Sequence, residues 1–308
     1  MKYYLAPMEG LTTYVYRTAY HRYFYHMDKY FTPFIVPHVN KDFNSREKNE
    51  ILPEHNQGQN LVPQILTNRA EDFLHTSNSL KKFGYEEINL NLGCPSKTVV
   101  SKGRGSGFLA KPKELDQFLD TVFSNTDLRI SIKTRIGKDD PEEFYELLAI
   151  YNKYPLTELI IHPRTQQDLY KNKPNLEIFG DAVKLCSCPV CYNGDIFTDE
   201  DRKNFTKRFP SVETLMLGRG ILRNPELRSN IEDHSPVDYN ILRAFHDELY
   251  EKYREILSGD KNVLFKMKEL WSYMITLFPE SEKYGKKIRK SEHRRQYEQA
   301  VCELFSQT

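Results

Sequence analysis

The sequence lacks the features that would place it in a membrane or outside the cell. No stretch of its 308 residues approaches the roughly 18 consecutive apolar residues of a membrane helix. Its start, MKYYLAPMEG, has neither the charged leader nor the long apolar core of a signal peptide. Its five cysteines are too few and too unevenly spaced for a disulfide framework. We therefore expect a cytoplasmic protein with reduced thiols and no membrane partner.

The sequence also has almost no net charge. Lys and Arg number 44 and Asp and Glu number 43, which leaves +1 and argues neither for nor against a nucleic-acid partner. The composition, 39% hydrophobic and 28% charged, is that of an ordinary globular protein. A disordered or collagen-like chain is excluded, and the length suits one large domain or two smaller ones.

Short β-rich runs alternate with segments of helical period from Met1 to about Ile231. This alternation is typical of repeated βα units around a parallel sheet. Several runs, such as LVPQIL and TELIIH, are apolar at successive positions, as expected of strands covered on both faces. The runs that qualify as strands are residues 3–6, 30–34, 61–66, 87–92, 129–134, 158–162, 190–193 and 214–218.

Eight strands in this order predict an α/β fold, a closed (β/α)8 TIM barrel. A doubly wound open sheet is the alternative. It usually has a glycine-rich turn after its first strand, whereas the turn PMEGLT contains only Gly10. We therefore favour the barrel.

Strand signals stop after about Ser235. Three later segments have helical patterns: residues 240–257, 262–278 and 280–307. Because Pro236 tends to end a preceding helix, we place a boundary there. The expected organisation is a barrel domain over residues 1–234 and a small all-helical domain over residues 235–308.

In a (β/α)8 barrel the active site lies at the carboxyl ends of the strands, often with a phosphate site after strands seven and eight. The seventh and eighth expected strands end in NGD and GRG, where glycine lets backbone N–H groups approach a phosphate closely. Each motif alone is as typical of an ordinary turn as of a phosphate site. Their joint placement predicts a phosphorylated cofactor. The polar or small residues at the strand ends are residues 6–9, Gln64, 91–95, 133–135, 162–164, 193–195 and 218–220.

Cys94 lies between Gly93 and Pro95, directly after the fourth expected strand. A lone cysteine is often a small buried hydrophobe, but this one lies at the expected mouth of the barrel, ahead of a glycine-spaced loop. An unperturbed thiol has a pKa of about 8.5 and is mostly protonated at neutral pH. Cys94 can therefore act as a proton donor or as a nucleophile.

Two further groups are candidates for a site. Cys186, Cys188 and Cys191 suggest zinc, but Cys191 occupies an apolar position in the seventh strand and no fourth ligand lies at the usual spacing, so we expect no metal. His162 is either a histidine satisfied inside the barrel or, with Arg164 two residues on, part of a ligand site. Its position at a strand end favours the ligand site.

The segment KYGKKIRKSEHRR, residues 283–295, is strongly basic. It contains seven Lys or Arg and one Glu. Lys283, Lys287, Lys290 and Arg294 recur at helical spacing, which predicts one basic helix face. Such a face is often only solvated surface, and contact with RNA phosphates is the other interpretation.

Taken in order, these segments resemble the tRNA-dihydrouridine synthases. The matching motifs extend from Leu5 to about Pro225: LAPMEG, VPQI, NLNLGCPS followed by VSKGRGSGFL, IKTRIG, IHPRTQQDLY, YNGDI and LGRGIL. The helical tail is similar to the second domain of that family. The resemblance implies an FMN- and NADPH-dependent enzyme that reduces the C5=C6 bond of a uridine in the D-loop of tRNA. The alternatives are a flavin barrel acting on a free pyrimidine, similar to dihydroorotate dehydrogenase, and a non-catalytic RNA-binding protein.

The resemblance also implies roles for individual residues. Cys94 would be the proton donor, and Asn91 would contact the uracil. The FMN ring, its polar edge and its phosphate would be lined by Pro7, Met8, Glu9, Gln64, Lys133, His162, Asn193, Gly194, Asp195, Gly218 and Arg219. The substrate RNA would be contacted by Arg135, Arg164, Lys286, Lys287, Lys290 and Arg294. With the barrel site in view, the basic segment is interpreted as an RNA contact, and tRNA and NADPH are the partners of an expected monomer.

Overall fold

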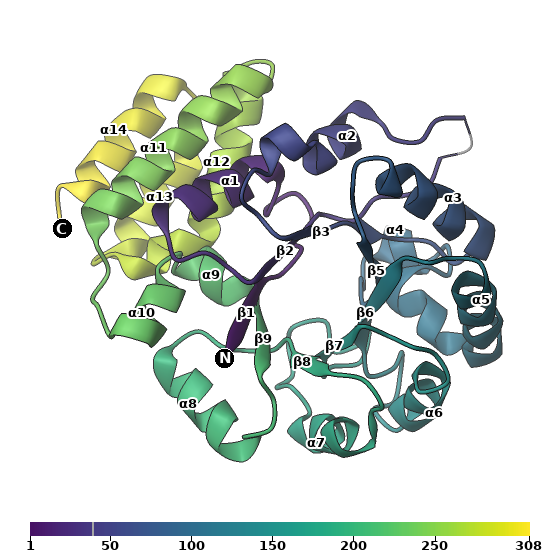
Figure 1. The fold of residues 1–308 in the computed structure, drawn as a ribbon. Coiled ribbons are helices and arrows are strands. Elements are labelled where there is room, and N and C mark those ends of the chain that lie inside the picture. The colour runs from purple at the N-terminus through teal and green to yellow at the C-terminus, as the bar shows by residue number, and fades with distance from the viewer. Residues whose placement is uncertain (39) are drawn as a thin grey trace.

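The structure, a computed structural model, describes residues 1–38 and 40–308, and it shows a ring of strands enclosed by helices (Figure 1). The strands are β1 (Lys2–Leu5), β2 (Lys29–Phe31), β3 (Leu61–Val62), β4 (Gln64–Ile65), β5 (Glu87–Leu92), β6 (Arg129–Arg135), β7 (Glu158–His162), β8 (Val190–Tyr192) and β9 (Thr214–Leu217). They form one parallel sheet in the order β3-β2-β1-β9-β8-β7-β6-β5-β4.

Pro63 divides the third expected strand into β3 and β4. Proline has no N–H to donate, so the ladder is interrupted there. β3 pairs with β2 and β4 pairs with β5, and a bridge between Ile35 and Ile65 adds a further contact. The two halves of this strand therefore bring the ends of the sheet together, and the predicted (β/α)8 TIM barrel is confirmed.

Helices follow most strands and then continue to the end of the chain. They are α1 (Tyr14–Tyr23), α2 (Ser45–Ile51), η1 (Pro53–His55), α3 (Ala70–Lys81), α4 (Lys97–Val100), η2 (Gly105–Ala110), α5 (Pro112–Ser124), α6 (Glu143–Tyr151), α7 (Leu176–Leu185), α8 (Asp199–Arg208), α9 (Arg219–Arg223), α10 (Leu227–Asp233), α11 (Tyr239–Ile256), α12 (Asp260–Met274), η3 (Ile275–Leu277), α13 (Ser281–Lys290) and α14 (Arg294–Phe305). None of these helices is long and apolar enough to span a membrane, among the residues that the structure describes.

Local capping fixes where the loops over the barrel mouth end. The Asn175 side chain accepts hydrogen bonds from two backbone N–H groups at the start of α7. Thr198 and Asp201 form a capping box at the start of α8. Pro112 occupies the first position of α5, where no N–H is needed. The loops that follow β5, β7 and β8 are therefore anchored at their far ends.

The barrel interior and the layer outside it are packed separately. Inside the strands lies a small apolar cluster that includes Tyr4, Phe31 and Met216. Outside, a larger cluster joins the strands to the surrounding helices and continues into α11–α14. Burial of such side chains contributes about 1.5–3 kcal/mol each, so both layers stabilise the ring.

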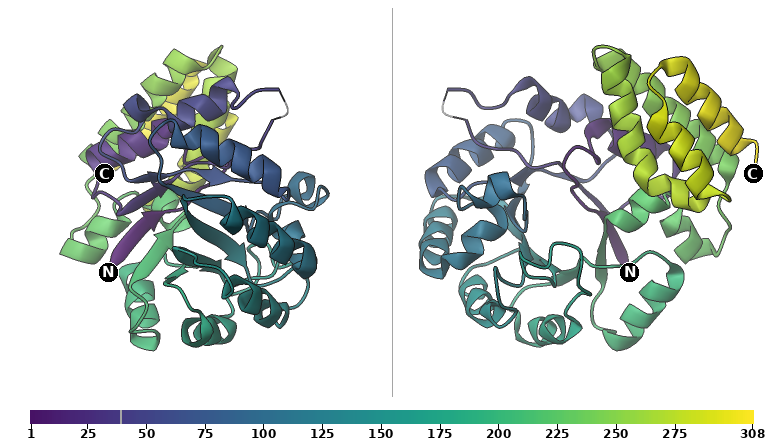
Figure 2. Two further views of the ribbon diagram at one scale, coloured as in Figure 1. Left: turned by 45° about the vertical axis from the view of Figure 1, so that its right-hand side comes forward. Right: turned by 180° about the vertical axis from the view of Figure 1, so that it is seen from behind.

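The C-terminal helices pack on one side of the barrel (Figures 1 and 2). Phe245 of α11 meets Tyr16 of α1 edge to face, with ring centroids 5.5 Å apart, and its ring lies 5.0 Å from that of Phe24. Because one apolar cluster runs through both parts, no gap in the core marks the boundary expected at residue 235. The division into residues 1–234 and 235–308 stays a prediction.

The prediction of a single basic helix face from Lys283 to Arg294 is wrong. α13 ends at Lys290, Ser291 has an extended backbone, and a capping box between His293 and Gln296 starts α14. Arg294 therefore lies on a different helix from the three lysines.

Several charges of this segment are also compensated. Lys283 pairs with Glu280, and Lys287 pairs with Glu303 of α14. Arg294 pairs with Glu298 one turn further along its own helix. Sequence spacing alone did not indicate these partners, two of which follow the basic segment. Lys286 and Lys290 differ from these residues. Among the described residues, no carboxylate lies within 4.0 Å of either lysine.

Glu158 is a buried carboxylate at the start of β7. The Tyr4 hydroxyl donates to it at 3.0 Å, and Lys29 Nζ lies 4.0 Å away. Lys29 is held more closely by Glu87, at 2.8 Å and 2.9 Å. Burial, only partly offset by Lys29, raises the pKa of Glu158 to about 7.

The difference in unfolding free energy between Glu158→Gln and the wild type is expected to favour the variant more at pH 8 than at pH 5. Because the folded-state pKa lies above the unfolded value, the wild type loses stability as the pH rises to about 7, and the glutamine removes that loss. The gain from pH 5 to pH 8 should be roughly 1–3 kcal/mol, since one pKa unit corresponds to about 1.4 kcal/mol. Urea unfolding at both pH values measures it.

Glu87→Gln is the control, because it removes the closer partner of Lys29 and should destabilise the protein at both pH values. A difference between Glu158→Gln and wild type that does not change with pH contradicts the account of Glu158.

Candidate active site

A cleft opens at the carboxyl ends of β1, β6, β7, β8 and β9. It is lined by Ala6, Pro7, Met8, Lys133, His162, Tyr170, Asn193, Gly194, Asp195, Gly218 and Arg219. The structure thus brings together most of the residues expected around a phosphorylated cofactor. Gln64 and Glu9 do not line this cleft, and Tyr170 is an addition that the sequence analysis missed.

Positive charge dominates the cleft. Arg164 and Arg219 share the carboxylate of Asp195, with 2.5 Å between Arg164 Nη2 and Asp195 Oδ2. Burial and the positive charge of Arg135 lower the pKa of Lys133 to about 8. Because the cleft holds more cations than carboxylates, its electrostatics favour an anionic ligand.

His162 is held neutral by this environment. Burial, followed by the charges of Arg135, Lys133 and other cleft cations, brings the pKa of His162 well below its usual range. Arg164 Nη1 lies 2.9 Å from His162 Nε2. Since a guanidinium can only donate, Nε2 accepts this bond and the proton of the neutral ring lies on Nδ1.

Tyr170 fills part of the cleft. It lies on the loop after β7, next to Leu169, whose φ of 50° is a left-handed conformation. The Arg219 guanidinium lies 4.6 Å from the centre of the Tyr170 ring, within cation–π range. The free volume of the cleft is about 60 Å³, well below the roughly 300 Å³ of the smallest typical ligand sites. Tyr170 is one of the side chains that narrow the cleft.

Asn91 fixes the turn that carries Cys94. Its side-chain oxygen accepts hydrogen bonds from the backbone N–H groups of Gly93 and Cys94, each at 3.0 Å. Its side-chain nitrogen donates to Gln64 Oε1 at 2.7 Å. The amide groups of Asn91 and Gln64 therefore face each other inside the barrel.

The same chain of buried amides continues across the strands. Gln64 donates to Asn89 at 2.7 Å, and Asn89 donates to Ser131 at 2.9 Å. Buried polar groups are costly unless they are paired, so each member depends on its neighbours. We call Gln64, Asn89, Asn91 and Ser131 the amide chain.

Cys94 lies half-buried at the mouth, on the loop between β5 and α4. The backbone N–H and the hydroxyl of Ser106 both donate to the Cys94 carbonyl, at 3.1 Å and 2.9 Å. Gly105 has a φ of 55°, and a Cβ there would lie 2.7 Å from the same carbonyl, so only glycine fits. Burial raises the pKa of the Cys94 thiol, which stays protonated at neutral pH.

Arg135 and Arg164 lie inside the protein, each only 1% exposed. Arg135 donates to the carbonyls of Gly93, Thr165 and Leu169 at 3.0, 2.7 and 2.9 Å, and so ties the Cys94 turn to the Tyr170 loop. Arg164 is committed to His162, Asp195 and the carbonyl of residue 172. In this structure both guanidinium groups position loops, and their contact with RNA stays a prediction.

Glu9 is exposed and pairs with Arg46 of α2. It does not line the cleft, but, in addition to burial, its charge helps to raise the pKa of Cys94. Lining of a flavin ring by Glu9 stays a prediction.

The other cysteines are not among the residues that line this cleft. The sulfurs of Cys186 and Cys188 are 3.4 Å apart, at the opposite end of the strands, and Cys191 is buried inside the barrel. Among the residues that the structure describes, no group of three or more His, Cys, Asp or Glu is placed to hold a metal ion.

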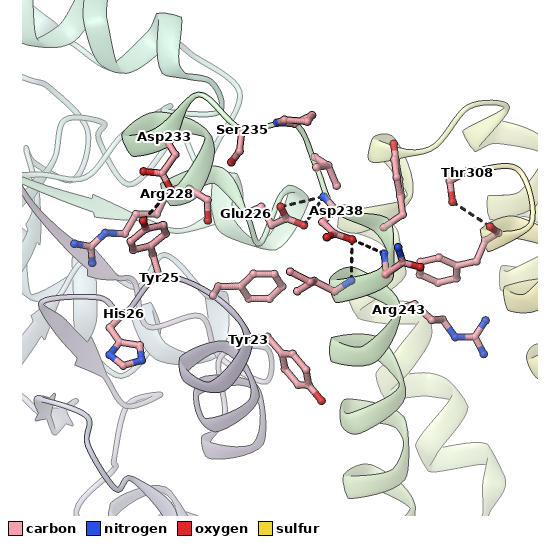
Figure 3. Close-up of a pocket in the computed structure, with 18 residues that line it drawn as sticks. Tyr23, Tyr25, His26, Glu226, Arg228, Asp233, Ser235, Asp238, Arg243 and Thr308 are labelled. Carbon is pink, nitrogen blue, oxygen red and sulfur yellow. Dashed lines mark hydrogen bonds between the residues drawn. The ribbon is translucent and has the colours of Figure 1, made fainter.

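A larger cavity, of about 1200 Å³, lies between the end of α1, α10 and α11 (Figure 3). Several of its polar side chains are paired within the fold. The Tyr25 hydroxyl donates to Asp233 at 2.8 Å, and Glu226 accepts from the backbone N–H of Asp238 at 2.9 Å. We assign no chemistry to this cavity.

The fold and the cleft define a TIM-barrel protein with a cation-rich cleft at the carboxyl ends of its strands. The sequence model of the family described as dihydrouridine synthase (Dus) matches residues 4–307. The chain belongs to the dihydrouridine synthase family.

Individual relatives agree with the family match. A probable tRNA-dihydrouridine synthase of Staphylococcus epidermidis is 29% identical over 202 residues, which are 63% of this chain and 61% of that protein. Probable tRNA-dihydrouridine synthase 2 of Bacillus subtilis is 27% identical over 257 residues, 81% of this chain and 78% of that protein. The matched segment thus spans about three fifths of the staphylococcal relative.

A solved structure supports the fold alone. A variant of NCR from Zymomonas mobilis superimposes with a TM-score of 0.52 at 11% identity, covering 79% of this chain and 90% of that chain.

Asn91→Ala is expected to loosen the Cys94 turn. The change removes three hydrogen bonds and leaves Gln64 Oε1 unpaired, which should lower the unfolding free energy by about 2–4 kcal/mol. The Cys94 thiol should also react faster with a maleimide. Urea unfolding measures the first quantity. Mass spectrometry of the peptide that contains Cys94 measures the second, because Cys302 is exposed and Cys186 and Cys188 are as accessible as Cys94.

Ser131→Ala, at the far end of the amide chain, is the control. It removes one hydrogen bond and leaves the bonds of Asn91 to the Cys94 turn in place, so the reactivity of Cys94 should change much less than in Asn91→Ala. Wild-type labelling of Cys94 in the Asn91→Ala variant would show that Asn91 does not fix the turn.

Proposed function

We propose that this protein is an FMN- and NADPH-dependent tRNA-dihydrouridine synthase that reduces the C5=C6 bond of a uridine in the D-loop of tRNA. The observation that carries the proposal is a cation-rich cleft beside a half-buried, protonated thiol at the barrel mouth, in a chain of the dihydrouridine synthase family. NADPH as reductant, the monomeric state and the cytoplasmic location belong to the proposal through the family resemblance.

The residues of the cleft fit FMN. The surplus of cations suits a phosphate dianion, and Asn193, Gly194, Asp195, Gly218 and Arg219 would hold it. At Gly218 a Cβ would come within 3.3 Å of Ala6 Cβ and 3.6 Å of Met8 Sδ, so glycine keeps this part of the cleft open. Pro7 and Met8 would lie along the ring, with Lys133 and His162 at its polar edge.

FMN, when bound, supplies the hydride, and the protein supplies the surroundings. Lys133 places a positive charge in a cleft with little water, where it stabilises a neighbouring anion strongly. The neutral His162 ring accepts from Arg164 and leaves Nδ1–H to donate. Both residues orient and stabilise, and they move no proton in this proposal.

Cys94 is the proposed proton donor. Once C6 of the uracil has accepted a hydride, C5 carries enolate character and requires a proton. The Cys94 thiol holds its proton at neutral pH because burial raises its pKa. Asn91 and Arg135 hold the turn from which Cys94 Sγ–H would donate to C5. Contact of Asn91 with the uracil requires that its amide exchange one of its present partners.

The target uridine must leave its stack to reach the cleft. The tRNA would then lie across the barrel mouth and the C-terminal helices. Lys286 and Lys290 line a shallow groove on α13 and are proposed to contact phosphates. Lys287 and Arg294 can contribute only if RNA displaces Glu303 and Glu298. Residues 1–234 would carry the chemistry and residues 235–308 the tRNA contacts.

Cys94→Ala is expected to lower the rate of dihydrouridine formation in tRNA by about 10²–10⁴-fold, the usual contribution of a general acid. Flavin content and reduction of the flavin by NADPH should stay near wild type, because Cys94 is assigned only to the protonation of C5. Mass spectrometry of tRNA digests measures the product, and absorbance measures the flavin.

Cys302→Ala, an exposed thiol on α14, is the matched control and should behave as wild type. Conversion of tRNA by Cys94→Ala at the wild-type rate would mean that another group or water protonates C5. Equal activity of the wild type on free uridine or orotate would favour the free-pyrimidine alternative.

FMN binding is expected to take up protons above about pH 8. The pKa of Lys133 is about 8 in the cleft, and an anion beside it raises that pKa, so lysine gains a proton as the ligand binds. Calorimetric titration at pH 8.5, in two buffers with different ionisation enthalpies, measures the uptake. FAD should bind more weakly, because the proposed phosphate-binding turns follow β8 and β9 and, in the part of the chain that the structure describes, no GxGxxG turn follows a strand.

Lys133→Met should bind FMN without this proton uptake. Equal uptake by the variant and the wild type would place the titrating group elsewhere, and tighter binding of FAD than of FMN would overturn the cofactor.

A further inference from the structure

Phe265 on α12 is the most exposed large apolar side chain among the described residues, at 70%. The buried side of α12 is formed by other residues, among them Leu264, Met267 and Trp271. Phe265 therefore contributes little to the core. Exposure of a whole phenyl ring to water is unfavourable unless something covers it.

The position of Phe265 around α12 is defined by its neighbours. Lys266, one residue later, reaches the carbonyl of Gly10, two residues beyond the cleft residue Met8. Lys268 reaches the carbonyl of Ser291, directly after α13. At about 3.6 residues per turn, Phe265 points outward between these two edges of the helix. It thus lies between the edge of α12 next to the loop of Gly10 and the edge next to the end of α13.

The surroundings of Phe265 are basic. Lys261 and Lys268 lie one turn before and one turn after it on the same side of the helix. The structure shows no carboxylate within 4.0 Å of either lysine among the described residues, whereas Lys266 is paired with Glu269. No carboxylate therefore neutralises Lys261 or Lys268 in the part of the chain that the structure describes, although Lys268 also donates to the Ser291 carbonyl. An exposed aromatic ring flanked by two such cations matches a nucleic-acid strand, which offers base faces for stacking and phosphates for the cations.

We propose that Phe265 is a stacking platform for an unpaired base of the RNA substrate, on the path between the barrel mouth and the basic groove of α13. Phenylalanine has no polar atom, so it contacts the face of the base and does not read its edge. The contact therefore tolerates any base and contributes affinity and placement rather than sequence recognition. This inference rests on the proposed function, because it takes tRNA as the substrate.

The test compares Phe265→Ala, Phe265→Trp and wild-type protein, each loaded with FMN, in binding of unmodified tRNA at several salt concentrations. Phe265→Ala should weaken binding by about 5- to 100-fold, the usual range for one stacked base. Its salt dependence should stay at the wild-type slope, because every lysine that faces a phosphate is still present. Phe265→Trp should keep the affinity, and its fluorescence should be quenched by tRNA. The native Trp271 is only 2% exposed and should not respond.

Two variants serve as controls. Leu185→Ala removes a side chain that is 55% exposed at the opposite end of the strands, and it should bind tRNA as the wild type does. A double variant of Lys286→Ala and Lys290→Ala should reduce the slope of log affinity against log salt by about 0.7–0.9 for each phosphate that a lysine no longer neutralises. Loss of base stacking thus lowers the affinity without changing the salt slope, whereas loss of phosphate contacts changes the slope.

Wild-type affinity of Phe265→Ala, or absence of quenching in Phe265→Trp, overturns the stacking proposal. So does a change in the oligomeric state of Phe265→Ala without a change in tRNA affinity, which would identify a protein contact. If the wild type binds tRNA but forms no dihydrouridine, the proposed function fails while the binding results still decide the role of Phe265. If the wild type binds no tRNA, both proposals fail.

Discussion

Buried positive charge at the carboxyl ends of the strands is the constraint on which the candidate site depends. Removing a guanidinium or ammonium group from water is costly unless it is paired. The protein meets this cost in different ways: Arg135 donates to three carbonyls, and Arg164 and Arg219 share Asp195. Among the residues that the structure describes, Lys133 has no such partner, and burial lowers its pKa to about 8. The same charges keep His162 neutral, so one electrostatic arrangement sets the protonation of the whole cleft.

The thiol is controlled by a separate set of interactions. The amide chain holds the Cys94 turn from inside the barrel, while Ser106 and Gly105 hold it from the loop side. Arg135 is the link between the two systems, because it binds the Gly93 carbonyl and also the loop that carries Tyr170. A change in the cleft can therefore reach the thiol through a single side chain.

Much of the fold could be predicted from the sequence, because strand-forming runs and helical periods are local properties. The eight expected strands and the cleft residues at their ends depend on that pattern and on the rule that barrel sites lie at strand ends. The division of one strand at Pro63 is also a local effect of a residue without an N–H, although the sequence analysis did not use it.

Side-chain direction and long-range partners could not be predicted in this way. Arg135 ends β6 and Arg164 follows β7, as expected, but both point into the protein because loop carbonyls accept their hydrogen bonds. Gln64 begins β4 and pairs with Asn89 of the neighbouring β5. Tyr170 enters the cleft through contacts with Arg219, which lies far along the chain. The basic helix face was wrong because the break at Ser291 and the acidic partners on α14 carry no periodic signal.

The contact between Lys266 and Gly10 affects which nucleotide of a folded RNA can reach the cleft. It joins α12 to the loop that enters the cleft, while α12 also packs on α9 and α13. The helical region and the barrel mouth thus keep a fixed separation. A rigid RNA laid along these helices could present to the cleft only a nucleotide at the matching distance from its docking points. Under the proposed function, the protein would select its target nucleotide by its distance from the docking points rather than by base identity.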